Sequence, residues 1–208
     1  MMDINQIDTS LELPIMEDFY TVQGEGFHTG RAAYFVRTAG CNVGCVWCDV
    51  KESWDAKKHQ LLSLDKIVKN IVDSQAGFCV ITGGEPCMYD LTSLTKKIKA
   101  KNIYIAIETS GCYELKGNID WYCFSPKKFS PPKEEAYKKA NELKIVISHP
   151  SDFKWAEIHA SKVSKNCKLY LQTEWSKKER FLPLIINYVK NNTKWKISLQ
   201  THKTMNIP

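Results

Sequence analysis

The sequence predicts an α/β fold, a partial (incomplete) TIM-like barrel of mostly parallel strands with helices outside. Three observations predict it. Short apolar segments rich in Val, Ile, Tyr and Phe alternate with segments of helical periodicity, as in a parallel sheet. Polar or glycine-rich clusters follow almost every apolar segment, and parallel barrels place active sites at the carboxyl ends of their strands. The chain has 208 residues, short for the roughly 250 of a full eight-unit barrel, so we expect an open barrel in a single domain, residues 1–208.

Strands are expected where β-branched and aromatic residues gather between turn signals. The segments of this kind are, in chain order, Ala32–Thr38, Phe78–Thr82, Ile103–Glu108, Ile119–Phe124, Leu143–Ile147, Lys168–Gln172 and Trp195–Gln200. Helices are expected between several of them. Ser63 can cap a helix over Leu64–Asp73, where apolar residues recur at helical spacing. Asp90 can cap a second helix over Leu91–Lys101, and a third covers Phe181–Asn191.

Composition favours an ordinary globular protein of the cytoplasm. Apolar residues make up 43% of the chain, which is enough for a sizeable core. No apolar run approaches the roughly 20 residues of a membrane span. The first ten residues include Asp3 and Asp8 and lack the apolar stretch of a signal peptide. We therefore expect no membrane partner.

The net charge is +6, from 29 basic and 23 acidic residues. Much of the excess comes from scattered lysines such as Lys96, Lys97 and Lys99, a pattern typical of solvated helix faces. Attraction to an anionic ligand, to nucleic acid or to an acidic redox partner is the alternative interpretation. Charge alone does not decide between them, and we interpret the lysines as solvated faces with no nucleic-acid partner.

Three of the eight cysteines form the motif that carries most chemical information. Cys41, Cys45 and Cys48 spell C-x3-C-x2-C, so three thiolates on one short segment can wrap around an iron–sulfur cluster. A [4Fe–4S] cluster usually takes four cysteines, and three leave one iron open for another ligand. A structural zinc site would need four ligands with paired spacings, and zinc or three unrelated buried cysteines are the alternatives. The other cysteines match no cluster motif and are expected to be small buried hydrophobes: Cys79, Cys87, Cys112, Cys123 and Cys167.

The cysteine segment resembles the cluster loop of the radical S-adenosylmethionine superfamily. In that superfamily the amino and carboxylate groups of S-adenosylmethionine chelate the open iron, and reductive cleavage yields a 5′-deoxyadenosyl radical. Thr82–Pro86 (TGGEP) is similar to the superfamily segment that contacts the methionine amino group, and glycines let a backbone approach a ligand closely. The resemblance implies these S-adenosylmethionine-binding residues: Trp47, Cys48, Asp49, Gly83, Gly84, Glu85, Thr109, Ser110, Ser125, Pro126, Lys127 and Gln172.

Both ends of the chain carry further matches. Phe19–Gly26 (FYTVQGEG), Arg37 and Ser198–Lys203 (SLQTHK) resemble the 7-carboxy-7-deazaguanine synthase family, over about Pro14 to Pro208. This resemblance implies a carbon–nitrogen lyase that converts 6-carboxy-5,6,7,8-tetrahydropterin to 7-carboxy-7-deazaguanine with loss of ammonia, in the biosynthesis of queuosine and other 7-deazapurines. It also implies a homodimer and an electron donor of the flavodoxin or ferredoxin type.

The same resemblance implies a set of substrate ligands whose chemistry suits a pterin. Gln23 has both donor and acceptor groups, and Glu25 can accept from ring N–H groups. Arg37 can form a charge-assisted pair with the substrate carboxylate. By family resemblance the free carboxylate of the last residue also reaches the pterin. The implied substrate-binding residues are Val22, Gln23, Gly24, Glu25, Arg37, Thr82, His202 and Pro208.

One position departs from the family pattern. The second residue after the last cluster cysteine is commonly a threonine that helps to hold Mg²⁺ beside the substrate, and here it is Val50. Valine offers no oxygen, whereas Mg²⁺ demands oxygen ligands in near-octahedral geometry. Asp49, a water or the substrate could still hold an ion. We expect weak or absent stimulation by Mg²⁺.

Two other functions are compatible with part of the sequence. A glycyl-radical activating enzyme that acts on a protein partner would share the cysteine motif, but not the matches at Gln23–Gly26 and Leu199–His202. A non-catalytic iron–sulfur or nucleic-acid-binding protein would rest on the cysteine loop and the net charge of +6 alone. Cleavage of S-adenosylmethionine without a protein partner would argue against both.

Overall fold

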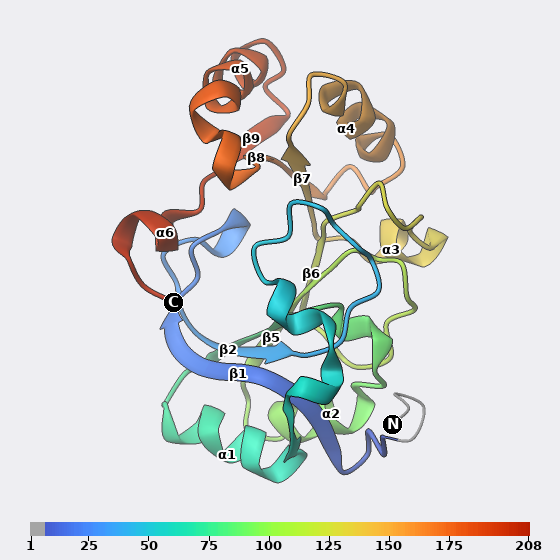
Figure 1. Cartoon of the computed structure of the whole chain (residues 1–208), viewed down its shortest axis with the longest axis vertical. Coiled ribbons are helices and arrows are strands. Elements are labelled where there is room, and N and C mark those ends of the chain that lie inside the picture. The colour runs from blue at the N-terminus through green and yellow to red at the C-terminus, as the bar shows by residue number, and fades with distance from the viewer. Residues whose placement is uncertain (1–6) are drawn as a thin grey trace.

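A sheet of nine strands organises the computed structural model, which describes residues 7–208 (Figure 1). The order across the sheet is β3-β1-β2-β4-β5-β6-β7-β8-β9. The strands are β1 (Glu12–Val22), β2 (Ala32–Thr38), β3 (Gln60–Ser63), β4 (Phe78–Gly83), β5 (Tyr104–Thr109), β6 (Trp121–Phe124), β7 (Glu142–Ile147), β8 (Lys168–Thr173) and β9 (Trp195–Ser198).

Every neighbouring pair from β2 to β9 is parallel, so the carboxyl ends of these strands meet at one edge. The strands β1 and β3 extend the sheet in antiparallel pairing beside β2. The sheet runs from β3 at one end to β9 at the other, so within residues 7–208 the barrel stays open. The predicted fold class, an incomplete barrel of mostly parallel strands, is therefore confirmed.

The helices lie outside the sheet, and all except α6, which follows the last strand, connect its strands. Figure 1 shows α1 and α2 together at one end of the molecule and α4 and α5 at the other, with α6 beside the segment that follows β1. The helices are α1 (Leu64–Asp73), α2 (Thr92–Lys99), α3 (Glu134–Lys139), α4 (Asp152–Ala160), α5 (Lys178–Asn191) and α6 (Thr201–Met205). Short 3₁₀ turns are η2 (Gly26–His28), η3 (Lys51–Trp54), η4 (Ala56–Lys58), η5 (Pro86–Met88) and η6 (Trp175–Lys177).

All seven predicted strands are present, with ends that differ by two residues or fewer. The helix over Leu64–Asp73 begins as predicted, since the Ser63 hydroxyl accepts a hydrogen bond from the backbone N–H of Lys66. The predicted end of the last strand at Gln200 is wrong. β9 ends at Ser198 because Gln200 leaves the extended conformation and becomes the N-cap of α6.

Five elements were not predicted: β1, β3, α3, α4 and α6. β1 contains a proline and several charges, and its register slips between Ile15 and Glu17, which breaks the alternation that marks a strand. The strand β3 and the helices α3 and α6 are too short to show a period. The helix α4 carries apolar residues around much of its circumference, so its sequence lacks a single apolar face.

The core lies between the sheet and the helices. The apolar face of α1, with Ile67 and Ile71 completely buried, packs into the same cluster as Leu13 of β1 and Ile81 of β4. The cysteines outside the cluster motif are all at least nine-tenths buried, which confirms the prediction that they serve as small hydrophobes. None of the helices within residues 7–208 has the length and apolar character needed to cross a membrane.

Candidate active site

A pocket of about 500 Å³ opens at the carboxyl ends of the parallel strands, a volume suited to a small-molecule ligand. Its walls contain the three cysteines of the motif, all of the implied substrate-binding residues, and all of the implied S-adenosylmethionine-binding residues except Pro126. Pro126 is buried, but it is not part of the wall. Val50 also lines the pocket. The strand ends thus bring together residues that lie far apart in the sequence.

The cysteine loop follows β2 and is anchored on the turn η3. The backbone N–H of Cys41 donates to the carbonyl of Trp54 at 3.1 Å, and that of Gly40 donates to the carbonyl of Ser53 at 2.6 Å. Burial raises the pKa of the Cys45 thiol to about 11, and the nearby Lys127 ammonium opposes that rise. Cluster formation must therefore displace protons from the thiols, as thiolate ligands require.

The donor set of this loop fits an iron–sulfur cluster. Three soft sulfur ligands share one short loop, with the pocket open in front of them. Within residues 7–208, no three His, Cys, Asp or Glu side chains converge on a single metal position. Cysteines that hold a cluster bind separate iron atoms, so their side chains need not converge on one point.

The Gly-Gly turn after β4 packs directly on the base of the cysteine loop. The backbone N–H of Glu85 donates to the carbonyl of Gly40 at 2.9 Å. A Cβ atom at Gly84 would lie 2.2 Å from that same carbonyl oxygen. A Cβ at Gly83, where φ is +136°, would lie 2.1 Å from the carbonyl oxygen of Thr38. Only glycine permits this approach at both positions.

The Glu85 carboxylate, which is 1% exposed, braces the end of β5. Its Oε1 accepts hydrogen bonds from the Thr109 hydroxyl at 2.5 Å and the backbone N–H of Cys87 at 3.1 Å. Its Oε2 accepts from the backbone N–H and the hydroxyl of Ser110, at 2.8 and 2.5 Å. These bonds occupy both oxygens. Glu85 therefore contributes to ligand binding mainly indirectly, because it fixes the positions of Thr109 and Ser110.

Residues after β6 lie close to the cysteine loop. The Lys127 ammonium donates to the Ser125 hydroxyl at 2.5 Å and lies 5.5 Å from the centre of the Trp47 ring. Burial lowers the pKa of Lys127, while the charge of the Cys45 thiolate would act to raise it. The Lys127 ammonium would therefore favour the thiolate form of Cys45 that a cluster needs.

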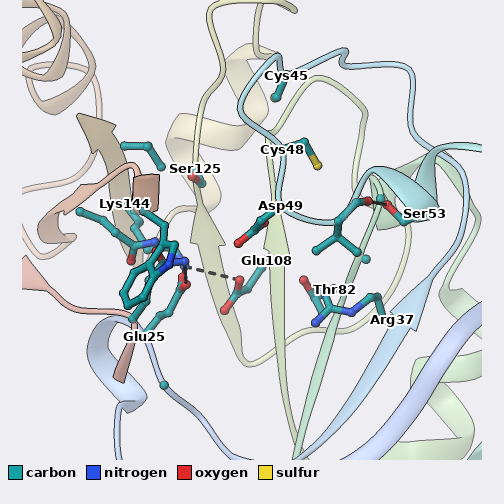
Figure 2. Close-up of a pocket in the computed structure, with 18 of the residues that line it drawn as sticks. Glu25, Arg37, Cys45, Cys48, Asp49, Ser53, Thr82, Glu108, Ser125 and Lys144 are labelled. Carbon is teal, nitrogen blue, oxygen red and sulfur yellow. Dashed lines mark hydrogen bonds and ion pairs between the residues drawn. The ribbon is translucent and has the colours of Figure 1, made fainter. Parts of the chain in front are cut away.

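A network of charged groups, buried at Lys144 and partly buried at its two carboxylate partners, forms the opposite wall (Figure 2). The Lys144 ammonium of β7 lies 2.5 Å from Glu25 Oε2 and 3.4 Å from Glu108 Oε2. The Gln23 amide donates to Glu108 Oε1 at 3.0 Å, and its own oxygen accepts from the backbone N–H of Glu25. The Gln200 amide donates to Glu25 Oε1 at 2.9 Å. The network fixes two carboxylates side by side.

The ion pairs of Lys144 with Glu25 and Glu108 determine the charge state of this wall. Burial acts to raise the pKa of Glu25, but the charge of Lys144 and the hydrogen bonds from Lys144 and Gln200 outweigh burial and lower that pKa to about 2. Burial likewise acts to lower the pKa of Lys144, but Glu108 and Glu25 raise it well above its usual value. Both groups therefore stay ionised across the physiological range.

Arg37 and Thr82 lie on the other side of Glu108 in Figure 2. The Arg37 Nε donates to Glu17 Oε1 at 2.7 Å, from directly across the β1–β2 pair. This bond leaves the terminal nitrogens of the guanidinium for an anionic ligand. On β8, the Gln172 oxygen accepts from the Ser198 hydroxyl at 2.7 Å, and that hydroxyl accepts from the backbone N–H of Gly26.

The segment after β9 closes one side of the pocket. The backbone N–H and the hydroxyl of Thr201 both donate to the carbonyl of Gly24, each at 3.0 Å. A Cβ atom at Gly24 would lie 2.4 Å from Nδ1 of His202. Burial lowers the pKa of His202 although Glu25 opposes the change, so the ring is neutral at pH 7. The carbonyl of Pro208 accepts from the Thr21 hydroxyl at 3.4 Å.

Several polar residues of the wall lie outside the ligand sets that the family resemblance implies, among them Glu108, Lys144 and Lys203. The importance of Lys144 could have been predicted from the sequence. It lies within the apolar segment Leu143–Ile147, and lysine is almost never fully buried unless it is paired with an opposite charge. Glu108 ends a predicted strand, where polar residues are common for many reasons. Lys203 belongs to a helix that was not predicted.

Comparison with known proteins adds the following likenesses. A model of the radical SAM superfamily matches residues 35–141. The chain is 56% identical to the 7-carboxy-7-deazaguanine synthase of Flavobacterium psychrophilum, over 94% of this chain and 93% of that one. It is 42% identical to the synthase of the same name from Synechocystis sp., over 95% of each chain. The crystal structure of QueE from Escherichia coli superposes with a TM-score of 0.82 at 30% identity, over 90% of this chain and 93% of that one.

Proposed function

The chain belongs to the 7-carboxy-7-deazaguanine synthase family of the radical S-adenosylmethionine superfamily, and from this premise we propose how its pocket performs the reaction. As a member it is a carbon–nitrogen lyase of queuosine biosynthesis that uses a [4Fe–4S] cluster and S-adenosylmethionine. Its substrate is the pterin that this family converts to 7-carboxy-7-deazaguanine. The alternative activity on a glycyl-radical partner is favoured only by the cysteine motif, which both families share.

The observation that carries the assignment of roles is the pairing of two unlike walls across one pocket. The cysteine loop lies on one wall, and the network of Glu25, Glu108 and Lys144 lies on the other. Cys41, Cys45 and Cys48 would hold the cluster. When bound, the cluster and S-adenosylmethionine supply the radical that removes the hydrogen at C6 of the pterin.

The S-adenosylmethionine side of the pocket is formed by the ends of β4, β5 and β6. The Gly83–Glu85 turn would present its backbone to the methionine group, at a position fixed by the carbonyls of Gly40 and Thr38. Hydroxyls of Thr109 and Ser110, held by Glu85, and of Ser125, held by Lys127, would meet the polar groups of the cofactor.

The substrate side is built to orient a flat polar ring. Glu108 retains acceptor capacity for a ligand, because its partners Gln23 and Lys144 each take one hydrogen-bonding site on a different oxygen, at 3.0 and 3.4 Å. Ring N–H groups of a pterin would donate to it. The free guanidinium nitrogens of Arg37 would pair with the substrate carboxylate. Neutral His202 and the backbone of Val22–Gly24 and Pro208 would complete the enclosure.

Several further properties belong to this proposal. The chain acts as a single domain, residues 1–208, and as a homodimer. A flavodoxin or ferredoxin supplies the electron. The reaction needs little or no added Mg²⁺, because the side chain of Val50, which lines the pocket, offers no oxygen ligand. Light scattering on the purified protein tests the dimer, and reduction of the cluster by each donor class tests the electron source.

The function is tested by anaerobic turnover. The cluster is reconstituted and reduced, S-adenosylmethionine and 6-carboxytetrahydropterin are added, and the product is identified by mass spectrometry. We expect 7-carboxy-7-deazaguanine from the wild type and none from Cys45→Ala. Cleavage of S-adenosylmethionine without this product would overturn the substrate assignment while leaving the radical chemistry in place.

A further inference from the structure

A second, much smaller cavity adjoins the substrate side of the pocket. Its volume is about 10 Å³, which gives room for about one water molecule. Gln23, Glu25 and Glu108 line both this cavity and the large pocket. His28 and Glu142 line the small cavity but not the pocket. The two carboxylates of the substrate wall therefore stand between the two spaces.

Glu142 begins β7, so it lies at the amino edge of the sheet, and it is 3% exposed. Its Oε2 accepts hydrogen bonds from Trp121 Nε1 at 2.9 Å and from the backbone N–H of Phe27 at 3.3 Å. Within residues 7–208, its Oε1 and the Nε2 of His28 are buried without a hydrogen-bond partner. Buried polar atoms are normally paired, so both atoms point to a water molecule in the cavity that bonds the two side chains.

The turn η2 holds His28 close to Glu142. Gly26 of this turn has a φ of +65°, and a Cβ atom there would lie 2.0 Å from Glu142 Oε1, so only glycine permits the approach. The Phe27 ring stacks on Trp121 with centroids 4.5 Å apart, and the His28 ring meets Trp121 edge-on at 4.8 Å. His28 is partly exposed whereas Glu142 is buried, so the histidine is the member of the pair that meets solvent.

The surroundings of Glu142 favour its protonated form. Burial raises its pKa and Glu108 adds to the rise, whereas Lys144 and the hydrogen bonds to its Oε2 oppose it. Burial lowers the pKa of His28, and the charge of Arg31 acts in the same direction. The other titratable groups near Glu142 are the ionised Glu25, which lines the same cavity, and three groups kept neutral because burial raises their pKa values: Cys123, Cys167 and Tyr170.

We propose that Glu142 and His28, bridged by one water molecule, form a proton relay that supplies the leaving amine of the substrate through Glu108. This inference rests on the proposed function. Loss of ammonia breaks a C–N bond whose electron pair stays with the nitrogen, and the departing amino group takes up one proton. The ring gives up one proton to solvent as it becomes aromatic, so the protons balance.

The order of the groups gives each one a step. Glu142 donates its proton through the water to Glu108, Glu108 donates to the amine, and Glu142 regains a proton from solvent through His28. Glu142 and His28 do not touch the substrate. They are therefore positioning residues, which hold the proton where Glu108 can receive it.

A matched pair of variants separates this role from a structural one. Glu142→Gln removes the acid, but its amide oxygen can still accept from Trp121 and Phe27. Glu157→Gln is the control, because Glu157 likewise accepts from a tryptophan N–H, that of Trp195 at 2.8 Å, and lines neither cavity. Urea unfolding verifies that each variant is folded.

The kinetic test is a single turnover with substrate that carries deuterium at C6. We expect Glu142→Gln to slow the release of ammonia by about tenfold or more, as the loss of a proton donor predicts, and to increase its solvent isotope effect. Transfer of deuterium to S-adenosylmethionine should keep the wild-type rate, and Glu157→Gln should match the wild type in both steps. Ammonia release at the wild-type rate in Glu142→Gln, or an equal slowing of both steps, would overturn the proposal.

Chemical rescue tests the outer end of the relay. His28→Ala removes the ring that meets solvent, so ammonia release should slow and should recover when imidazole is added to the solution. Imidazole should not restore Glu142→Gln, because the missing acid of that variant is buried. Equal rescue of the two variants, or no rescue of His28→Ala, would contradict the relay.

A spectroscopic test does not depend on turnover. The infrared difference spectrum between wild type and Glu142→Gln at neutral pH should contain the carbonyl stretch of a protonated carboxylic acid, and this band should shift in D₂O. Bands of an ionised carboxylate in its place would overturn the proposal. A wild type that makes no 7-carboxy-7-deazaguanine would instead count against the proposed function, and the infrared spectrum would still report on Glu142.

Discussion

At the scale of single residues, paired buried charges determine the character of the pocket. Lys144 is 4% exposed, and its ammonium has the carboxylates of Glu25 and Glu108 as partners. An isolated charge in such a position would be strongly unfavourable, but its carboxylate partners offset the loss of solvation. The same ion pairs orient the carboxylates of Glu25 and Glu108 in the pocket wall. Stability and substrate binding therefore both depend on Lys144.

Replacement of Lys144 by Met should therefore lower both stability and activity. The change leaves two partly buried carboxylates without their cation, and the loss in free energy of unfolding should approach the roughly 3–5 kcal/mol of a broken buried pair. Urea unfolding measures it. The double variant Lys144→Met/Glu25→Gln should regain much of the stability but not product formation. Wild-type kcat/KM in Lys144→Met would contradict this account.

The buried histidine His159 predicts how the stability of the protein depends on pH. His159 of α4 is 5% exposed, and its Nδ1 forms a hydrogen bond with the Tyr137 hydroxyl at 2.9 Å. Burial lowers the pKa of His159 from 6.5 to about 4. Between pH 6.5 and about 4, His159 is therefore protonated in the unfolded chain but neutral in the folded chain. The associated stability is complete above pH 6.5 and is lost as the pH falls toward 4.

This loss should be smaller in His159→Gln. The variant cannot take up the proton in its unfolded state, so its free energy of unfolding should fall less steeply between neutral pH and pH 4 than that of the wild type. Other acidic groups titrate in both proteins and cancel in the comparison. Urea unfolding at a series of pH values measures the two slopes. Equal slopes would show that the histidine is not buried in its neutral form.

At the scale of elements, the junction between the cysteine loop and the turn after β4 is the critical contact. Two backbone hydrogen bonds, from Gly84 to Thr38 and from Glu85 to Gly40, hold it together, each at 2.9 Å. There is no space for a side chain at Gly84. The Gly-Gly turn therefore supports the cluster site as well as any bound cofactor.

Gly84→Ala should impair cluster assembly. Its Cβ would collide with the carbonyl of Gly40 and push the cysteine loop away from the strand ends. We expect a clear loss of bound iron after reconstitution, measured by iron content and visible absorbance. Gly77→Ala is the control, because no atom lies within 4 Å of a Cβ at that position. Equal iron content in the two variants would rule out this coupling.

The sequence predicted the elements whose signals are local. Strands such as Ala32–Thr38 are dense in apolar residues, and α1 has both a cap and a period, so each could be located without knowledge of its neighbours. β1 could not, because its pairing with β2 and β3, rather than its own pattern, makes it a strand. The same holds for α6, whose position depends on contacts with Gly24.

At the scale of the whole molecule, the open barrel brings one set of residues from distant segments to a single edge. Gln23, Glu108, Lys144 and Gln200 belong to four such segments, and they share one hydrogen-bonded network. Motifs could identify the cysteine loop and the Gly-Gly turn because each is contiguous. The partners of Glu25 could not be identified in that way, since their proximity depends on the order of strands in the sheet.

The cysteine wall and the carboxylate wall would hold cofactor and substrate face to face, so that the radical forms beside C6 of the pterin. The most direct test is a single turnover with substrate that carries deuterium at C6, followed by mass spectrometry of the recovered S-adenosylmethionine. The account predicts deuterium in the adenosyl moiety, together with 7-carboxy-7-deazaguanine. Formation of the product with no deuterium in that moiety would contradict it.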